Sequence, residues 1–288
     1  FVAESMPERR RAFFGGLLHS GTYWGFLLGA LVNLAIGGLL GWRWMFFVGV
    51  LPALFVLYIR TQVRQDTARW QEARQRAGFW TYLRDVLRPP YRTRSLCNAT
   101  LVTIGLLGFW ASSQYLPTAI KALALGSGYE PGVSTALGSI GAGVLALLTA
   151  LACICAPLLC NRFGRRRTLA ILFGLMIIGI SGGYAWAYPE KNLPLFFLFI
   201  VVMGIGGADF AVFTIWLPEQ YPTSLRASGF AFSTTISRFV AAIGTFAIGY
   251  GISAAGIALP LALTAAPFLL AFALLRFSPE TRDQILPD

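Results

Sequence analysis

Residues 195–217 read LFFLFIVVMGIGGADFAVFTIWL, and this stretch decides the fold class because Asp209 is the one charged residue among its 23. A helix of about 20 apolar residues crosses a bilayer, since it satisfies its own backbone hydrogen bonds inside the hydrocarbon. Seven further apolar stretches follow the same rule. We therefore predict an all-α membrane protein with eight transmembrane helices, at residues 12–36, 44–59, 96–120, 133–160, 169–187, 195–217, 229–252 and 257–275.

The composition excludes several classes of protein. Of the 288 residues, 56% are hydrophobic and 12% are charged, whereas soluble domains carry about 25% charged residues. This excludes a soluble enzyme, a disordered chain and a nucleic-acid-binding domain, in spite of the formal net charge of +11. No nucleophile–base set or phosphate-binding loop occurs in a plausible context, so we expect no enzyme activity. The four cysteines lie in or beside apolar runs without His or acidic neighbours, which predicts buried thiols and neither a disulfide framework nor a metal site.

The placement of the basic residues predicts the orientation. With eight spans, both ends of the chain lie on one side, and the loops on that side contain nineteen Arg residues. The opposite loops contain only Arg43, Lys121 and Lys191. Because cytoplasmic loops carry the excess of Lys and Arg, we predict that both ends are cytoplasmic. One basic residue, Arg238, lies inside the seventh predicted span.

A short motif occurs twice and predicts an internal repeat. Glu4, Pro7 and Arg11 precede the first span with the same spacing as Glu219, Pro222 and Arg226 before the seventh, 215 residues later. Six spans separate the copies, so the repeating unit is six helices and the chain contains the fifth to twelfth of an expected twelve. We expect that the chain begins within a longer protein, since four spans upstream would complete the first unit.

This repeat predicts the domain organisation. Residues 1–60 form the last two helices of an N-terminal bundle, 61–95 a cytoplasmic interdomain linker, and 96–288 a six-helix C-terminal bundle with a cytoplasmic tail. The linker region mixes nine Arg residues between positions 60 and 94 with Trp70, Trp80 and Tyr82. That mixture favours an amphipathic helix at the cytoplasmic lipid surface. The alternative is a solvated linker.

Five short segments resemble motifs of the major facilitator superfamily. The turn from Asn161 to Arg167, NRFGRRR, resembles the D-R-x-G-R-R loop between the eighth and ninth helices of the family, with Asn161 in place of the acid. Residues 218–226, PEQYPTSLR, are similar to the family's P-E-x-x-P-T-x-x-R after the tenth helix, and SPET at 278–281 is similar to its P-E-T ending. Residues 42–47, WRWMFF, and 51–54, LPAL, resemble segments at its sixth helix.

Within this superfamily, the chain most resembles the metabolite:proton symporters, which import sialic acid, aromatic acids and other organic acids. The resemblance implies uptake of a small organic acid with a proton by alternating access, driven by the proton gradient without a cofactor, in a monomer. The Arg-, Ala- and Gly-rich composition indicates a bacterium, so we expect an integral protein of the cytoplasmic (inner) membrane. The alternatives are a sugar or polyol carrier, an exporter or antiporter, and a sensor that binds without transport.

Ionisable residues inside spans are costly unless they are paired or functional. Asp209 and Arg238 lie at similar depths on consecutive helices, as judged from a rise of about 1.5 Å per residue. We predict that they pair, that protonation of Asp209 frees Arg238, and that Arg238 then binds a substrate carboxylate through its planar fork. The alternative is a structural ion pair. His19 is a second candidate for the proton site, or else a packing residue.

The remaining candidates fall into two groups. Trp110, Gln114 and Tyr115 form an unusually polar and aromatic stretch within a span and, with Tyr23, are candidate substrate-binding residues, although Trp110 and Tyr115 also suit an aromatic belt at the membrane interface. The loop motifs supply candidate gating residues. These are Glu4, Arg11, Asn161, Arg162, Gly164, Arg165, Arg166, Glu219 and Arg226.

Overall fold

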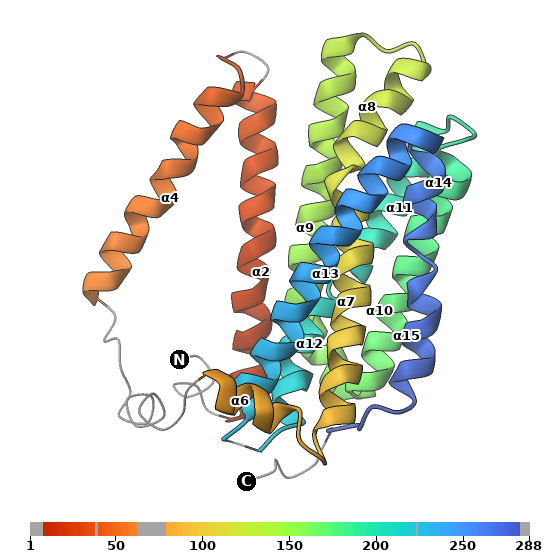
Figure 1. Cartoon of the computed structure of the whole chain (residues 1–288). Coiled ribbons are helices and arrows are strands. Elements are labelled where there is room, and N and C mark those ends of the chain that lie inside the picture. The colour runs from red at the N-terminus through yellow and green to blue at the C-terminus, as the bar shows by residue number, and fades with distance from the viewer. Residues whose placement is uncertain (1–7, 38–39, 63–78, 223, 283–288) are drawn as a thin grey trace.

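The computed structural model describes residues 8–37, 40–62, 79–222 and 224–282, and every regular element within them is a helix (Figure 1). The prediction of an all-α protein is therefore confirmed. The helices are α2 (Glu8–Val32), η1 (Asn33–Gly37), α4 (Trp42–Gln62), α6 (Phe79–Val86), α7 (Arg92–Gln114), α8 (Leu116–Gly126), α9 (Pro131–Phe163), α10 (Arg165–Ile180), η2 (Ser181–Ala187), α11 (Leu193–Gly206), α12 (Asp209–Glu219), α13 (Arg226–Ala255), α14 (Ala258–Leu263) and α15 (Pro267–Leu275). Here η1 and η2 are π-helical segments.

Six helical segments are long and apolar enough to cross a membrane, and they match the last six predicted spans. They are Arg92–Gly126, Pro131–Phe163, Arg165–Ala187, Leu193–Glu219, Arg226–Ala255 and Ala258–Leu275. The first two predicted spans also form helices, α2 with η1 and α4. The apolar part of α4, Trp42–Tyr58, is shorter than the other six segments. The helical extents are thus as predicted, with ends that differ by a few residues.

Three of the six long segments are interrupted, which the apolar pattern does not reveal. The first breaks at Tyr115, because Pro117 stands in the first turn of α8 and has no N–H to continue the helix. The fourth breaks between α11 and α12 at Gly207 and Ala208, and the sixth at Pro267. Such breaks give irregular backbone inside the bundle, where it contributes to sites.

The helices run lengthwise beside one another, and α2 begins at the same end at which α15 finishes (Figure 1). Along α9 lies α2, and directly after α2 the side chain of Asn33 in η1 donates to Ser139 at 2.7 Å. Along α7 lies α13, where Ser237 donates to the Ala99 carbonyl at 3.0 Å. The core between these pairs is filled by large buried side chains such as Trp216.

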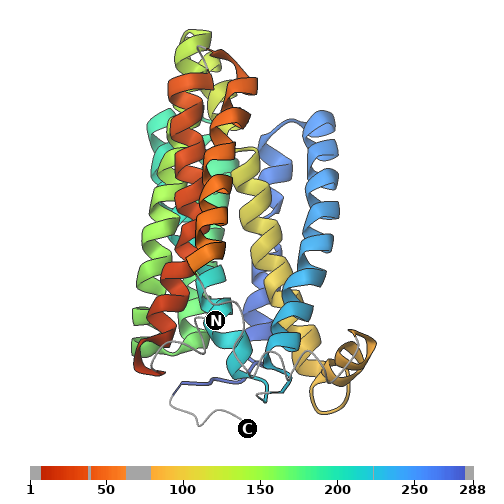
Figure 2. The same ribbon diagram turned by 90° about the vertical axis from the view of Figure 1, so that its left-hand side faces the viewer.

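Near η1, α4 meets α2 and then diverges from it, so its sides are largely exposed (Figures 1 and 2). At the lower end, α6 packs against α13 and buries Val86 while Trp80 is 77% exposed. Trp70 of the predicted linker lies outside the described residues, and the division into two bundles stays a prediction.

Candidate functional site

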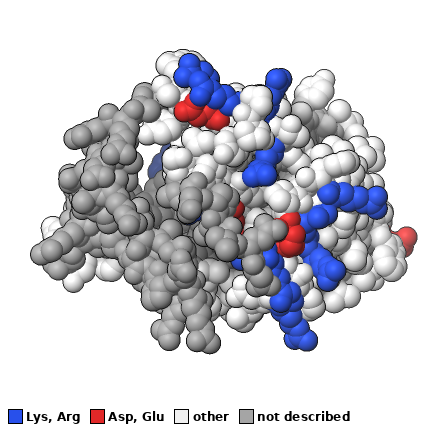
Figure 3. Space-filling view, turned by 90° about the horizontal axis from the view of Figure 1, so that it is seen from below, with Lys and Arg blue, Asp and Glu red and all other residues white. Residues whose placement is uncertain are grey.

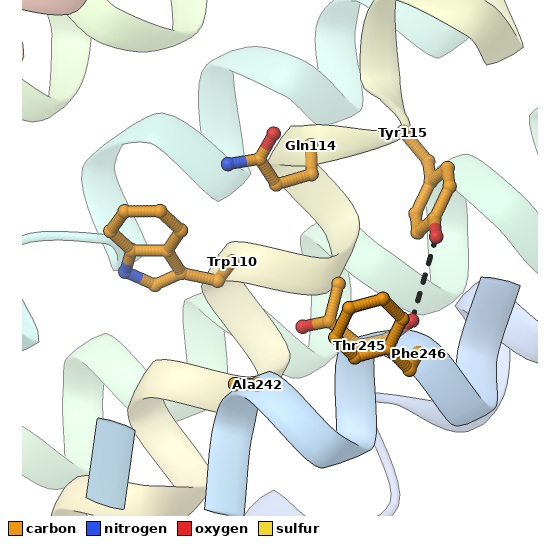
Figure 4. A pocket seen from close by; sticks show the side chains of 6 residues that line it. All are labelled: Trp110, Gln114, Tyr115, Ala242, Thr245 and Phe246. Carbon is orange, nitrogen blue, oxygen red and sulfur yellow. Dashed lines mark hydrogen bonds between the residues drawn. The ribbon is translucent and has the colours of Figure 1, made fainter. Parts of the chain in front are cut away.

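A cavity of about 380 Å³ lies between α7 and α13, near the break that ends α7 (Figure 4). This volume lies within the range of small-molecule sites. Its lining residues are Trp110, Gln114, Tyr115, Ala242, Thr245 and Phe246. Three predicted substrate-binding residues, Trp110, Gln114 and Tyr115, therefore line one pocket. Sequence reasoning missed the three residues from α13.

The local structure explains how α7 presents these side chains. Trp110 and Gln114 are four residues apart and so lie on one face of the helix, and both project from the same side in Figure 4. Tyr115 is the C-terminal cap of α7 and reaches α13, where its hydroxyl donates to the Thr245 carbonyl at 3.5 Å. The pocket thus combines aromatic surfaces with neutral hydrogen-bonding groups.

Arg238 is exposed on α13, and the predicted pair with Asp209 does not form. Within the part of the chain that the structure describes, the side-chain ion pairs are Arg88–Asp85 and Arg165–Glu219. The prediction that Asp209 holds Arg238 was wrong because similar depth on two consecutive helices does not fix the faces that they present. Arg238 instead lies four residues before Ala242 and seven before Thr245, which places it on the pocket face of α13, one turn from the lining residues.

Asp209 is fully buried at the start of α12. Its Oδ1 accepts the backbone N–H of Phe210 at 2.7 Å, whereas Oδ2 has no hydrogen-bond partner among the described residues. Oδ2 lies against α7, where a Cβ added to Gly105 would overlap it. A buried acceptor without a donor costs free energy, so this carboxyl is a candidate for a proton or a water molecule.

Tyr23 and His19 approach this carboxyl from α2. Tyr23 is buried, and its hydroxyl donates to the Gly207 carbonyl at 3.3 Å, two residues before Asp209. The Tyr23 ring meets Phe109 edge to face at 5.7 Å. His19 stacks on Phe210 with ring centroids 5.9 Å apart, and its Nε2 is buried with no partner in the described structure. The structure thus places Tyr23 with the proton candidates, and its ring contacts Phe26, which in turn contacts the pocket residue Trp110.

Several predicted gating residues meet at the lower end of the bundle. Arg165 makes two hydrogen bonds to Glu219, from Nε at 3.0 Å and from Nη2 at 2.8 Å. Thr281 donates its hydroxyl to the same Glu219 at 2.6 Å. Glu280 accepts the backbone N–H groups of Arg165 and Arg166, at 2.9 and 3.0 Å, and so caps the start of α10. We call Arg165, Glu219, Glu280 and Thr281 the tail latch.

Residues next to the tail latch also help to hold it together. Gly164 has a φ of 88°, and a Cβ there would crowd the Glu280 carboxylate, so glycine allows the close approach. Trp216 donates its indole N–H to the Pro279 carbonyl at 3.0 Å, and Arg282 donates to the Arg162 carbonyl at 2.8 Å. The SPET segment was the sequence signal for Glu280 and Thr281, which were not predicted as site residues.

The remaining predicted gating residues either take no part in the tail latch or lie outside the residues that the structure describes. Asn161 is exposed, and Arg226 donates to the Tyr221 carbonyl at 3.4 Å. Glu4 lies outside the described residues, as does the side chain of Arg11.

Two forces act on the pKa of Glu280. Partial burial raises it, but hydrogen bonds from the backbone N–H groups of Arg165, Arg166, Arg282 and Thr281 favour the carboxylate, and the net effect is a pKa below the ordinary value. Glu280 is therefore ionised at neutral pH. Among the described residues, no group of three or more His, Cys, Asp or Glu could hold a metal ion.

Comparison with known proteins relates the chain to transporters. A family model described as Major Facilitator Superfamily matches residues 1–159 and again residues 129–287. The chain is 29% identical over 256 residues to a probable 4-methylmuconolactone transporter of Cupriavidus pinatubonensis, covering 86% of this chain and 56% of that protein. It is 25% identical over 281 residues to the cis,cis-muconate transport protein of Acinetobacter baylyi, covering 93% of this chain and 64% of the relative. The chain thus spans less than two thirds of the length of either relative.

A solved structure shares the fold. The proton:xylose symporter bound to 6-bromo-6-deoxy-D-glucose superposes with a TM-score of 0.72 and 18% identity, over 99% of this chain and 68% of that one. At this identity the likeness concerns the fold alone.

Proposed function

Because the chain belongs to the major facilitator superfamily, we propose that it is part of a secondary transporter that takes up a small organic acid together with a proton. The muconate and methylmuconolactone transporters support an organic-acid substrate, since muconate is a dicarboxylate. The proton gradient supplies the energy and no cofactor takes part. In this proposal the protein works as a monomer in a bacterial inner membrane.

The observation that carries the substrate class is Arg238 on the face of α13 that lines the pocket. An exposed Arg without an ion-pair partner in the described chain is available to a carboxylate, which its guanidinium binds through two parallel hydrogen bonds. Gln114, Tyr115 and Thr245 then supply neutral contacts to the rest of the molecule, and the rings of Trp110 and Phe246 supply apolar surface. The pocket holds the body of the substrate while Arg238 selects the anion.

Asp209 is the proposed proton site, with His19 as its companion on α2. Both have a buried polar atom without a partner in the described residues, and a proton on Asp209 Oδ2 removes the cost of a buried charge. Since Oδ2 abuts Gly105 on α7, a proton there changes the contact between α12 and the helix that carries Trp110 and Gln114. In this proposal, protonation of Asp209 acts through the contact between α12 and α7, and it does not act by releasing Arg238 from an ion pair.

Alternating access then requires two bundles that rock about the pocket. We assign residues 1–60 to the first bundle, 61–95 to the cytoplasmic linker and 96–288 to the second bundle, with both ends cytoplasmic. The tail latch joins the starts and ends of several helices within the second bundle, so we expect it to keep that bundle rigid while the bundles rock. Glu4 and Arg11 stand at the corresponding place of the first bundle in sequence.

The neutral lining of the pocket favours a second candidate, an uncharged sugar or polyol. Gln114, Tyr115 and Thr245 offer hydrogen bonds suited to hydroxyl groups, and Arg238 lies a turn outside the lining. The two candidates differ in what Arg238 does.

Uptake into vesicles that contain the full-length protein separates them. Arg238→Gln should raise KM for transported carboxylates by about 10- to 100-fold, since hydrogen bonds to charged groups contribute about 1.5–3 kcal/mol. Arg238→Lys should restore part of the loss, and Arg92→Gln, which removes an exposed charge at the start of α7, should change nothing. Unchanged apparent affinity for every acid, or transport of polyols alone, would contradict the organic-acid proposal.

A further inference from the structure

A second cavity, of about 570 Å³, lies at the lower end of the bundle between the start of α10 and the end of α15. It is remote from the substrate pocket, which lies where α7 breaks. Its lining residues are Phe163, Gly164, Arg166, Arg167, Ala170, Phe272, Leu275, Arg276, Glu280 and Arg282. Four arginines and a single carboxylate therefore face one space.

The charges in this cavity are unbalanced. Arg166, Arg167 and Arg276 form no ion pair with any described residue, and the Glu280 carboxylate is occupied by backbone N–H groups. The side chain of Arg282 donates to the Arg162 carbonyl. Seen from this end, basic side chains are more prominent than acidic ones over the described surface (Figure 3). The cavity thus offers several guanidinium groups to an anion.

The walls of the cavity are apolar on the side toward the membrane. Ala170 lies near the start of α10 and Phe272 near the end of α15, so both are close to this end of the bundle. Leu275 is buried beside them. Next to them, Ile171, Leu269 and Leu270 are exposed, and they belong to segments apolar enough to span a bilayer. An occupant with a charged head and a hydrocarbon body would match both parts, whereas a free small anion would use the head region alone.

We propose that this cavity binds an anionic phospholipid from the leaflet that the positive-inside rule makes cytoplasmic. The phosphate lies among Arg166, Arg167 and Arg276, where guanidinium forks bind phosphate oxygens through paired hydrogen bonds. The acyl chains run along Phe272 and the exposed leucines of α15. Basic pockets between helices on the cytoplasmic side suit such headgroups.

The bound lipid would also adjoin the tail latch. Glu280 lines the cavity and caps α10 with the same carboxylate, so a phosphate among the neighbouring arginines reduces the excess of positive charge beside the capped helix start. The lipid therefore links the membrane composition to the stability of this end of the bundle.

The test uses the full-length protein in nanodiscs of phosphatidylethanolamine with and without phosphatidylglycerol, and native mass spectrometry to measure retained lipid. The double variant Arg167→Gln/Arg276→Gln should retain phosphatidylglycerol roughly 30-fold more weakly, because each basic residue near an anionic surface contributes appreciably to binding. The matched control Arg84→Gln/Arg92→Gln removes two exposed charges from the same end and should retain the lipid as the unmodified protein does.

Two further measurements complete the test. The thermal unfolding of both double variants in phosphatidylethanolamine alone shows whether they fold, and the unmodified protein should retain phosphatidylglycerol in preference to phosphatidylethanolamine whatever the variants do. Equal retention by both double variants, or no preference by the unmodified protein, would overturn the proposal. Displacement of the lipid by inorganic phosphate at similar concentration would also overturn it, because the cavity would then be a site for soluble anions.

Discussion

Two carboxyl groups in this chain, those of Asp209 and Glu280, differ in how their oxygens are hydrogen-bonded. Glu280, at the lower end of the bundle, accepts backbone N–H groups from four residues, two at the start of α10 and two that follow it in the tail. Asp209, inside a membrane-spanning segment, accepts one N–H on Oδ1 and has no described partner for Oδ2.

The difference indicates what each group is for. A carboxylate whose acceptors are satisfied stabilises the fold and has little to gain from a proton. A buried carboxyl with an unsatisfied oxygen costs free energy in its charged form and is a place where protonation changes the structure. We therefore expect changes at Asp209 to affect transport and changes at Glu280 to affect stability.

The largest expected effect comes from Asp209→Asn. Asparagine keeps the contact with the Phe210 N–H but cannot take up and release a proton as a carboxyl does, so substrate should no longer accumulate against its gradient when a proton gradient is imposed. Unfolding should not become easier, since the change removes a buried charge, which costs more free energy to bury than the neutral amide that replaces it. Vesicle uptake and thermal unfolding measure the two parts. Accumulation at the unmodified level would remove Asp209 from the coupling.

Glu280→Ala should have the opposite effect, a loss of stability without a loss of transport. Losing the cap of α10 should lower the free energy of unfolding by about 2 kcal/mol, the upper range for a helix cap, while proton-driven uptake by the folded fraction stays intact. Glu190→Ala provides the control, because Glu190 is exposed near the opposite end of the bundle. If both variants unfold at the same temperature, the cap has no structural role.

Thr281→Val tests a second contact of the tail latch, the hydrogen bond between Thr281 and Glu219. The hydroxyl donates to Glu219, which remains held by Arg165, so the expected loss is about 1 kcal/mol in the free energy of unfolding. Combining it with Arg165→Gln in a double-mutant cycle measures how far the two donors depend on each other. Strictly additive losses would show that the latch is a set of separate bonds.

The smallest effect is a dependence on pH. Since the folded state holds the pKa of Glu280 below its ordinary value, its contribution to stability is complete above the ordinary pKa and is lost as the pH falls through the lowered one. Unfolding followed from neutral to acidic pH should therefore show a loss in the unmodified protein that is smaller in Glu280→Ala. Parallel curves for the two proteins would assign the loss to other groups.

The sequence predicted the helices well and their contacts less well. Apolar length alone located the spans, because the hydrocarbon core tolerates little else than helix. The pairing of Asp209 with Arg238 failed, since depth follows from counting residues whereas the rotation of α12 and α13 depends on packing, for example of Gly105 against Asp209. The pocket residues of α7 could be predicted because they lie in a conspicuous polar stretch of the sequence. The pocket residues of α13 could not, because only the folded structure shows that α13 lies beside this stretch, where Tyr115 donates to the Thr245 carbonyl.

The capped start of α10 has a practical consequence for anyone who makes this protein. A chain shortened to end at Leu275 would leave the first amides of α10 without an acceptor, Glu219 without the Thr281 hydroxyl and the Trp216 indole without the Pro279 carbonyl. Purification tags and fluorescent fusions should therefore be attached beyond Arg282, where a linker of glycine and serine leaves these contacts in place.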